Sequence, residues 1–130
     1  MALKRKEKPT PLSADTLELI ALRFKLLSEP MRLRILHELM AGGRTVSDLV
    51  GRLGTGQANI SKHLGLLLQN GVLSRRKQGL NAYYEICDTS VFRLCDLVCG
   101  SLGKRLERMQ ELVKPVNRAS ALQASPRRKI

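Results

Sequence analysis

The residues best placed to do chemistry lie along one short segment, residues 57–69. If this segment is a helix, Ile60, His63, Leu64 and Leu67 share one face. The opposite side of the helix carries amide, cationic or small side chains, namely Gln57, Ala58, Asn59, Lys62 and Gln69. Amides can pair with adenine, a lysine can reach guanine or phosphate, and small residues allow close approach. Such a face suits the major groove of DNA, although any exposed helix face is polar.

A second candidate segment is cationic. Arg75, Arg76 and Lys77 are consecutive, and they precede a turn-forming run at residues 78–81 and a second short segment at residues 82–86. This pattern predicts a β-hairpin. A basic hairpin directly after a DNA-reading helix suits contact with phosphates or with the minor groove. The alternative is an edge hairpin whose charges prevent aggregation.

Cys95 and Cys99 are spaced for thiol or soft-ion chemistry. Positions i and i+4 of a helix place the Cβ atoms about 5–6 Å apart, whereas a disulfide requires about 3.5–4.5 Å. The pair is therefore better suited to a soft metal or metalloid ion (arsenite, zinc or cadmium), to a longer sulfur bridge, or to a bond between two chains. The alternative is simple packing, because free cysteine behaves as a small apolar residue. Cys87 lies near the end of the second hairpin segment, about six helical residues before Cys95, which corresponds to about 9 Å. It is not expected to be a third ligand in the same subunit.

Four helices must position the first of these segments. Apolar residues at i, i+3, i+4 and i+7 predict a helix from the caps Ser13 and Asp15 to about residue 27, and further helices at about 30–40, 45–53 and 57–69. In the second helix the buried stripe is expected at Met31, Leu33, Leu36, Leu39 and Met40. The three-residue connection 54–56 predicts a helix-turn-helix.

A last helix is predicted from about residue 88 to residue 114, before Pro115. Its apolar residues alternate in spacings of three and four, as in a helix that packs lengthwise on a partner. A domain this small has little left to cover such a seam. We therefore expect a two-fold dimer interface formed by the first and last helices, with Leu17, Ile20, Phe92, Leu102, Leu106 and Met109.

Composition limits the class of protein. The chain has 130 residues, 43% of them apolar and 26% charged, which is typical of one globular domain. No apolar run approaches the roughly 18 residues of a membrane span, and the basic start does not resemble a secretory signal, so we expect a cytoplasmic protein. We expect a basic disordered arm at residues 1–12, a DNA-binding and dimerisation domain at 13–114, and a basic disordered tail at 115–130.

Charge indicates the partner. The formal net charge is +12, an excess that favours a polyanion. From residue 49 to residue 84 there is no Asp or Glu, while five cations fall in this stretch: Arg52, Lys62, Arg75, Arg76 and Lys77. The acid-free stretch coincides with the predicted helix-turn-helix and hairpin, which favours nucleic-acid contact.

The sequence resembles the bacterial ArsR/SmtB family of winged-helix repressors over roughly residues 24–112. The most specific stretches are 24–36 (FKLLSEPMRLRIL), 54–57 with 60–64, and 79–84. The resemblance implies a mainly α fold with a small β-hairpin, a winged helix-turn-helix. It further implies a homodimer that binds double-stranded DNA at an imperfect inverted repeat, represses transcription, and is released by an inducer.

The resemblance also implies which residues contact DNA. Gln57, Asn59, Ser61, Lys62 and His63 match the family's recognition helix, although Gly56 replaces the serine that is common at its cap. His63 has an equally good interpretation as a half-buried, hydrogen-bonded core residue. With the hairpin included, the expected contacts are Gln57, Ala58, Asn59, Ser61, Lys62, His63, Arg75, Arg76, Lys77 and Asn81.

The sequence departs from the family in its sensing residues. Residues 45–49 hold no cysteine pair, and no histidine follows His63, so the two best-known metal sites are missing. Cys87, Cys95 and Cys99 remain, and in a cytoplasmic chain they favour metal or redox chemistry over a structural disulfide. We therefore expect either inducer sensing at Cys95 and Cys99 or a repressor without a metal site.

Two other classes of function remain as alternatives. A basic nucleoid-coating or RNA-binding protein would use the charged ends, but the chain has only two tyrosines and two phenylalanines on which bases could stack. A thiol redox enzyme would use Cys95 and Cys99, but Cys-x-x-Cys and a βαβ pattern are both missing. We therefore expect that the protein is not an enzyme and has no catalytic residues.

Overall fold

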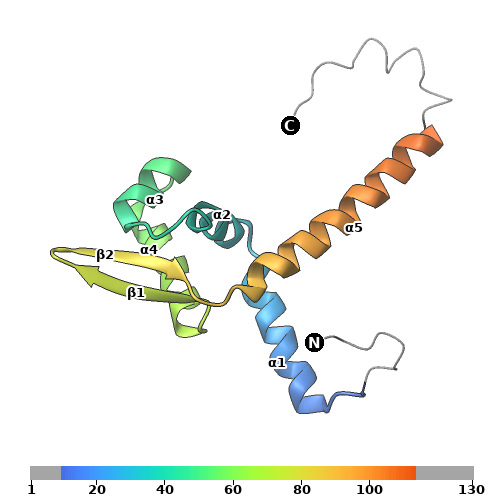
Figure 1. The fold of residues 1–130 in the computed structure, drawn as a ribbon, viewed down its shortest axis with the longest axis horizontal. Coiled ribbons are helices and arrows are strands. Elements are labelled where there is room, and N and C mark those ends of the chain that lie inside the picture. Colours follow the sequence, from blue (N-terminus) through green and yellow to red (C-terminus); the bar gives the residue numbers. More distant parts are fainter. Residues whose placement is uncertain (1–9, 114–130) are drawn as a thin grey trace, which may run out of the picture. The chain divides into compact units, whose positions relative to one another are not determined.

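The computed structural model describes residues 10–113; residues 1–9 of the predicted arm and all of the predicted tail lie outside the described residues. Within 10–113, the chain forms five helices and a two-stranded hairpin (Figure 1). Their order is α1 Ala14–Leu27, α2 Pro30–Leu39, α3 Val46–Leu53, α4 Gln57–Gln69, β1 Leu73–Gln78, β2 Asn81–Ile86 and α5 Ser90–Val113. The chain divides between Asp88 and Thr89 into two compact units, which we describe separately.

Side-chain caps fix where the first helices begin. The hydroxyl of Ser13 accepts a hydrogen bond from the Thr16 backbone N–H at the start of α1. At the start of α2, the carboxylate of Glu29 accepts from the backbone N–H groups of Met31 and Arg32 at 2.8 and 3.2 Å. Pro30 occupies the first turn of α2, where its missing N–H costs nothing. These starts agree with the sequence prediction.

The helix-turn-helix depends on one capping box and one glycine. Thr45 and Asp48 exchange hydrogen bonds between side chain and backbone at the start of α3, which satisfies two free backbone donors. Gly54 ends α3 with a φ of +68°, in the left-handed region, where a residue with a Cβ is strained. The chain then enters α4 after only Thr55 and Gly56, so the two helices are forced to cross closely.

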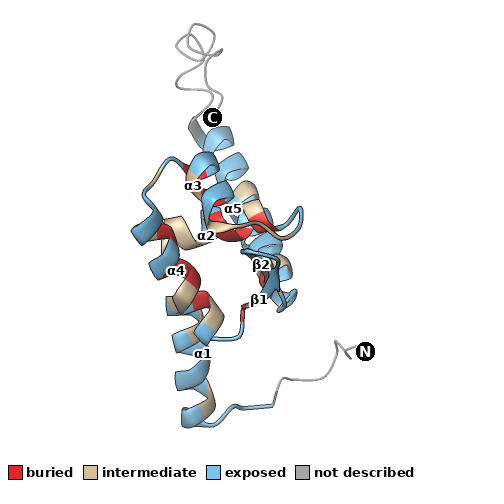
Figure 2. Cartoon of the chain, turned by 90° about the vertical axis from the view of Figure 1, so that its left-hand side faces the viewer, coloured by how far each residue is buried: buried red, intermediate tan, exposed pale blue. Residues whose placement is uncertain are grey.

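The core of the first unit is formed by α2, α3, α4 and the residues that follow α4. Its fully buried large side chains are Ile35, Leu49, Ile60, Leu64, Leu67 and Val72, and Figure 2 shows the buried segments gathered on these elements. Burying one such side chain stabilises the fold by roughly 1.5–3 kcal/mol. All four residues predicted for the buried face of α4 are buried.

The predicted stripe of α2 was wrong in part. The structure buries Ile35, Leu36 and Leu39, whereas Leu33 is 39% and Met40 54% exposed. Because α2 contacts α3, α4, β2 and α1, its buried face is set by four neighbours rather than by one. A stripe chosen from sequence spacing alone could not anticipate that Ile35 faces them.

The hairpin is a regular antiparallel ladder from Leu73↔Ile86 to Gln78↔Asn81. The two turn residues are Gly79 and Leu80. Gly79 has a φ of +66°, whereas Leu80 has a negative φ, because every positive φ in the described residues belongs to a glycine. Positive φ at the first central residue alone is the pattern of a type II′ turn, which fits the twist of a hairpin. Arg44, between α2 and α3, pairs with Tyr84 as an isolated bridge, so the base of the hairpin is tied to the helical core.

The second unit is described through α5, a helix of 24 residues. Large apolar side chains are exposed along it: Leu97, Val98, Leu102, Leu106, Met109 and Leu112. Charged residues are spread along its sequence. None of the helices within residues 10–113 is both long enough and apolar enough to span a bilayer. α5 therefore offers a long amphipathic face.

Replacing Gly54 by Ala tests the turn of the helix-turn-helix. A Cβ at Gly54 would meet no atom within 4 Å, so the cost comes from backbone conformation alone, and we expect a loss of about 1–2 kcal/mol of unfolding free energy. Urea denaturation measures it. The control is Gly51→Ala, which is equally unobstructed but helical, and should gain about 0.5–1 kcal/mol. Changes of the same sign in both variants would contradict this account of the turn.

Candidate nucleic-acid interface

α4 presents one face to the core and the other to solvent. Ile60, His63, Leu64 and Leu67 are buried, while the side chains at positions between them are exposed: Gln57, Ala58, Ser61, Lys62 and Gln69. The helix begins at Gly56 without a side-chain cap, so its first backbone N–H groups keep no side-chain acceptor there. A helix N-terminus of this kind favours negative charge such as a phosphate.

Asn59 differs from its neighbours on this surface. It is half-buried, and its amide nitrogen donates a hydrogen bond to the Thr55 hydroxyl at 3.1 Å. This contact leaves the amide oxygen as the group that can accept a bond from a base. The sequence pattern placed Asn59 on the fully exposed face, and the structure instead ties it to the turn.

His63 is a core residue of α4. It is 5% exposed, and Nη1 of Arg32 lies 3.2 Å from its Nδ1. A guanidinium can only donate, so Nδ1 is the acceptor and the neutral ring carries its proton on Nε2. Nε2 lies 3.9 Å from the Glu29 carboxylate. The structure therefore supports the core interpretation of His63 and does not offer its ring to a groove.

Arg32 joins three helices through one side chain. Its Nε donates to the Leu26 carbonyl near the end of α1 at 2.6 Å, and its Nη1 contacts His63 of α4. Its own backbone N–H donates to Glu29, the cap of α2. Because these groups are partly buried, losing one leaves its partners unsatisfied, which costs more than the hydrogen bond itself contributes. The cluster fixes α4 against α1 and α2.

Burial sets the titration of this cluster. Desolvation lowers the pKa of His63 below its ordinary value; the Glu29 carboxylate opposes this, and the charges of Arg32 and Lys62 add to it. For Glu29, desolvation raises the pKa, but hydrogen bonds from the Arg32 and Met31 backbones, with the nearby positive charges, lower it overall. Around neutral pH the cluster thus holds a neutral ring between a cation and an anion.

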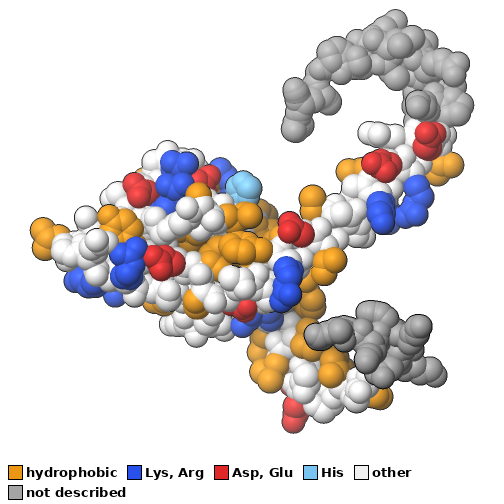
Figure 3. All heavy atoms as spheres, in the orientation of Figure 1, with side chains coloured by type: hydrophobic (Ala, Val, Ile, Leu, Met, Phe, Trp, Pro, Cys, Tyr) orange, Lys and Arg blue, Asp and Glu red, His pale blue; other side chains and the backbone are white. Residues whose placement is uncertain are grey.

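The cations of the hairpin divide between its two faces. Arg76 is ion-paired with Glu85 at 2.7 Å and also donates to the side chain of Gln78, and it stacks over Tyr83. Arg75 and Lys77 alternate with Arg76 along β1 and so lie on the other face, where Arg75 approaches Tyr84. Figure 3 shows Lys and Arg side chains gathered over the hairpin.

Ion pairs leave three cations of the acid-free stretch without a carboxylate partner. Arg52 pairs with Glu38 at 2.6 Å, a contact that lowers the pKa of Glu38, and Arg76 pairs with Glu85. Within residues 10–113, no carboxylate pairs with Lys62, Arg75 or Lys77. The predicted contribution of Arg76 to DNA contact thus competes with its pair to Glu85, whereas the other three cations need no such exchange.

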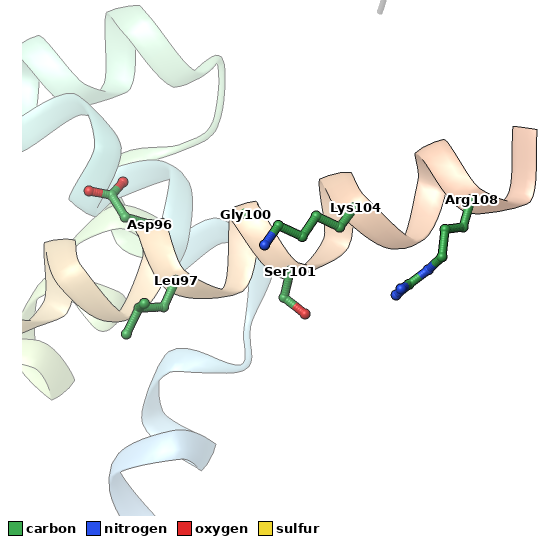
Figure 4. A pocket seen from close by; sticks show the side chains of 6 residues that line it. All are labelled: Asp96, Leu97, Gly100, Ser101, Lys104 and Arg108. Carbon is green, nitrogen blue, oxygen red and sulfur yellow. The ribbon is translucent and has the colours of Figure 1, made fainter. Parts of the chain in front are cut away.

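The cysteines are exposed and free. Cys87, Cys95 and Cys99 all have solvent access, and the Cys87 thiol lies 3.3 Å from the Gly71 carbonyl. No group of three or more His, Cys, Asp or Glu side chains that could hold a metal ion occurs in the described part of the chain. A shallow hollow on α5 is lined by Asp96, Leu97, Gly100, Ser101, Lys104 and Arg108 (Figure 4). Neither cysteine of α5 lines it.

Known proteins share this arrangement. Residues 27–76 match a family model described as a helix-turn-helix domain. The chain is 34% identical over 70 residues to the arsenical resistance operon repressor of Bacillus subtilis, a match that covers 53% of this chain and 67% of the relative. The chain belongs to the ArsR/SmtB family of winged-helix transcriptional repressors. This family consists of transcriptional regulators, which confirms the expectation that the chain is not an enzyme.

Two further relatives extend the comparison. The probable mercury resistance operon repressor of Streptomyces lividans is 35% identical over 75 residues, and the match spans 58% of each chain. The solution structure of the homodimeric winged helix-turn-helix DNA-binding domain of Mb0332 from Mycobacterium bovis superposes with a TM-score of 0.66 at 29% identity. That superposition covers 78% of this chain and 94% of the other. The predicted winged helix-turn-helix fold is confirmed.

Replacing His63 by Gln tests the buried cluster. Since the folded-state pKa is lowered, the neutral ring's contribution to stability is present above about pH 6.5 and is lost as the pH falls through the folded-state pKa. We expect the melting temperature of the unsubstituted chain to fall between pH 7 and pH 5, and to fall less in His63→Gln.

The control is His37→Gln, which replaces an exposed histidine of α2 and reports the effect of the substitution away from the buried cluster. An equal loss of melting temperature on acidification in His63→Gln and the unsubstituted chain would show that His63 is not the group being titrated.

Proposed function

We propose that the chain is a dimeric, sequence-specific DNA-binding repressor. The observation that carries this proposal is the exposed polar face of α4 together with three cations, Lys62, Arg75 and Lys77, that no carboxylate within residues 10–113 neutralises. A helix with that face fits the major groove, and a basic hairpin beside it fits the adjacent backbone. We place its action in the cytoplasm, because a repressor works where its DNA is.

The polar and small residues in the first turns of α4 have distinct roles in this proposal. Gln57 lies in the first turn and reads a base edge through its amide, and Lys62 reaches a guanine or a phosphate. Ala58 and Ser61 are small enough to let the helix approach the bases. Asn59 contributes through its amide oxygen and the second hydrogen of its amide nitrogen, since the Thr55 hydroxyl accepts only one hydrogen.

The second copy of the chain covers the apolar faces of α1 and α5. On α1, Leu17, Leu19 and Phe24 are more than half exposed, at 52, 66 and 52%, and Ile20 is 37% exposed. On α5, Leu102, Leu106 and Met109 are 54, 57 and 48% exposed. Apolar residues in continuous stripes favour burial in an interface. The similar Mb0332 domain is homodimeric, and a two-fold dimer would read an imperfect inverted repeat.

Salt dependence separates the two kinds of DNA contact. The chain should bind its own promoter DNA with an affinity whose logarithm falls with the logarithm of salt by about 0.9 per neutralised phosphate. Arg75→Ala should lower this slope by about one and weaken all sequences alike. Gln57→Ala should weaken the promoter site by about 1–3 kcal/mol and leave the slope unchanged. Fluorescence anisotropy titrations at several salt concentrations give both quantities.

The outcomes of that titration distinguish the proposed repressor from its alternatives. A steep slope with no preference between promoter DNA and random duplex would favour a nucleoid-coating protein, and tighter binding to single-stranded RNA would favour an RNA-binding one. Either result would overturn sequence-specific repression.

We further propose that Cys95 and Cys99 sense the inducer. Both thiols are exposed on α5 and lie one helical turn apart, so two soft sulfur atoms fit one soft metal or metalloid ion. With no third ligand in the described residues, the remaining coordination would come from the second copy or from water. Bound there, a soft ion would displace two thiol protons and fix the helix surface that the dimer shares. The alternative is a family member in which these cysteines only pack.

The double substitution Cys95→Ser with Cys99→Ser tests the sensor. We expect the variant to bind promoter DNA as the unsubstituted chain does but to stay bound when arsenite, Zn²⁺, Cd²⁺ or a persulfide donor is added. Anisotropy of labelled DNA reports the release. Cys87→Ser is the matched control and should still be released. Normal release of the double variant would show that the pair senses nothing.

A further inference from the structure

Leu80 is the most exposed large apolar residue within residues 10–113. It is 100% exposed, whereas the next large apolar side chain in the described residues, Leu112, is 78% exposed. The exposed apolar residues of α1 and α5 have others one helical turn away, so one partner surface can cover them together. Leu80 has no such neighbours, because Gln78, Gly79 and Asn81 surround it in the sequence.

The turn holds Leu80 at the outermost point of the hairpin. Gly79 takes the positive φ of the turn, and the last ladder pair, Gln78↔Asn81, closes directly beneath the two turn residues. A two-residue turn on a paired ladder has little freedom to fold its side chain back. The position of Leu80 is therefore set by the backbone.

Arg76 orients the amide next to Leu80. Its Nη1 donates to Oε1 of Gln78 at 2.6 Å, while its Nε and Nη2 donate to Glu85 at 3.1 and 2.7 Å. An amide whose oxygen is engaged in this way presents its NH₂ as the group that donates. Asn81, across the ladder from Gln78, is exposed. The tip thus carries an apolar side chain between two amides.

This combination matches the chemistry of the DNA minor groove. At A·T pairs that groove shows only acceptors, adenine N3 and thymine O2. Proteins that bind there read the acceptors with Asn, Gln, Arg or Lys, and many insert an apolar side chain, Leu among them, between base pairs. Behind the tip, Arg75 and Lys77 lie two residues apart on one face of β1, where they can meet phosphates. No carboxylate within residues 10–113 pairs with either of them.

We propose that Leu80 at the hairpin tip acts as a wedge in the minor groove beside the site read by α4. Gln78 and Asn81 donate to A·T acceptors, and Leu80 inserts between two base pairs and partly unstacks them. The inference rests on the proposed DNA binding and on the minor-groove contact expected of a basic hairpin. It adds the side chain that unstacks the bases, the base composition that the tip prefers, and a kink in the duplex. Leu80 was not among the contacts expected from the sequence, because a single leucine in a turn carries no pattern.

The test uses the full chain and a duplex that it selects from a random library. 2-Aminopurine, whose fluorescence rises when it unstacks, replaces adenine at successive positions flanking the α4 site. We expect binding of the unsubstituted chain to raise fluorescence at one step. Leu80→Ala should abolish that rise and weaken binding about tenfold, with an unchanged salt slope because no phosphate contact is lost. Leu33→Ala, at another exposed leucine on α2, is the control and should behave as the unsubstituted chain.

A second arm tests the groove itself. 2,6-Diaminopurine in place of adenine at the same step adds an amino group to the minor groove, and it should weaken the unsubstituted chain several-fold. Tight binding by Leu80→Ala with the fluorescence rise intact would overturn the wedge while leaving the repressor standing. Failure of the unsubstituted chain to select any duplex would overturn the proposed function, and this inference with it.

Discussion

The structure depends on α4 having one apolar face buried in the core and one polar face exposed to solvent. Ile60, Leu64 and Leu67 are fully buried, and together they contribute roughly 5–9 kcal/mol by burial alone. A domain of this size has a net stability of only about 5–15 kcal/mol. The helix that faces outward with polar side chains is thus also a main support of the core. A substitution on its buried face would unfold the domain before it altered recognition.

The buried histidine adds orientation to that support. Apolar contacts are not directional, whereas the contacts of Arg32 with Leu26 and His63 are at 2.6 and 3.2 Å and require particular angles. They link the end of α1 to α4. The proposed second copy would pack on the exposed apolar residues of α1, a helix that this cluster joins to α4.

Most of the fold could be predicted from the sequence, because local signals and tertiary packing agree. Ser13, Pro30 and Thr45 begin helices where caps and proline predict, and the buried face of α4 follows its spacing. Prediction was weaker where several neighbours compete, as at Leu33 and Met40 of α2. It was also weaker where pairing depends on the fold, because the ion pair of Arg76 with Glu85 and the contact of Asn59 with Thr55 require side-chain positions that spacing does not give.

The sequence predicted the kind of site, a DNA-reading surface, better than it predicted which side chains are exposed on it. An acid-free stretch and a three-residue turn indicate a DNA-reading surface, and family membership agrees with it. They do not tell an exposed amide from one held by the turn, nor a reading histidine from a buried one. The cysteine pair remains a prediction, because its exposure permits sensing without requiring it.

Dimethyl sulfate footprinting on promoter DNA tests the central claim most directly, because it methylates guanine N7 in the major groove and adenine N3 in the minor groove. The account predicts protected guanines in two clusters about one helical turn apart, one for each α4 of a dimer. Binding that leaves every guanine N7 as reactive as in free DNA would show that α4 does not occupy the major groove.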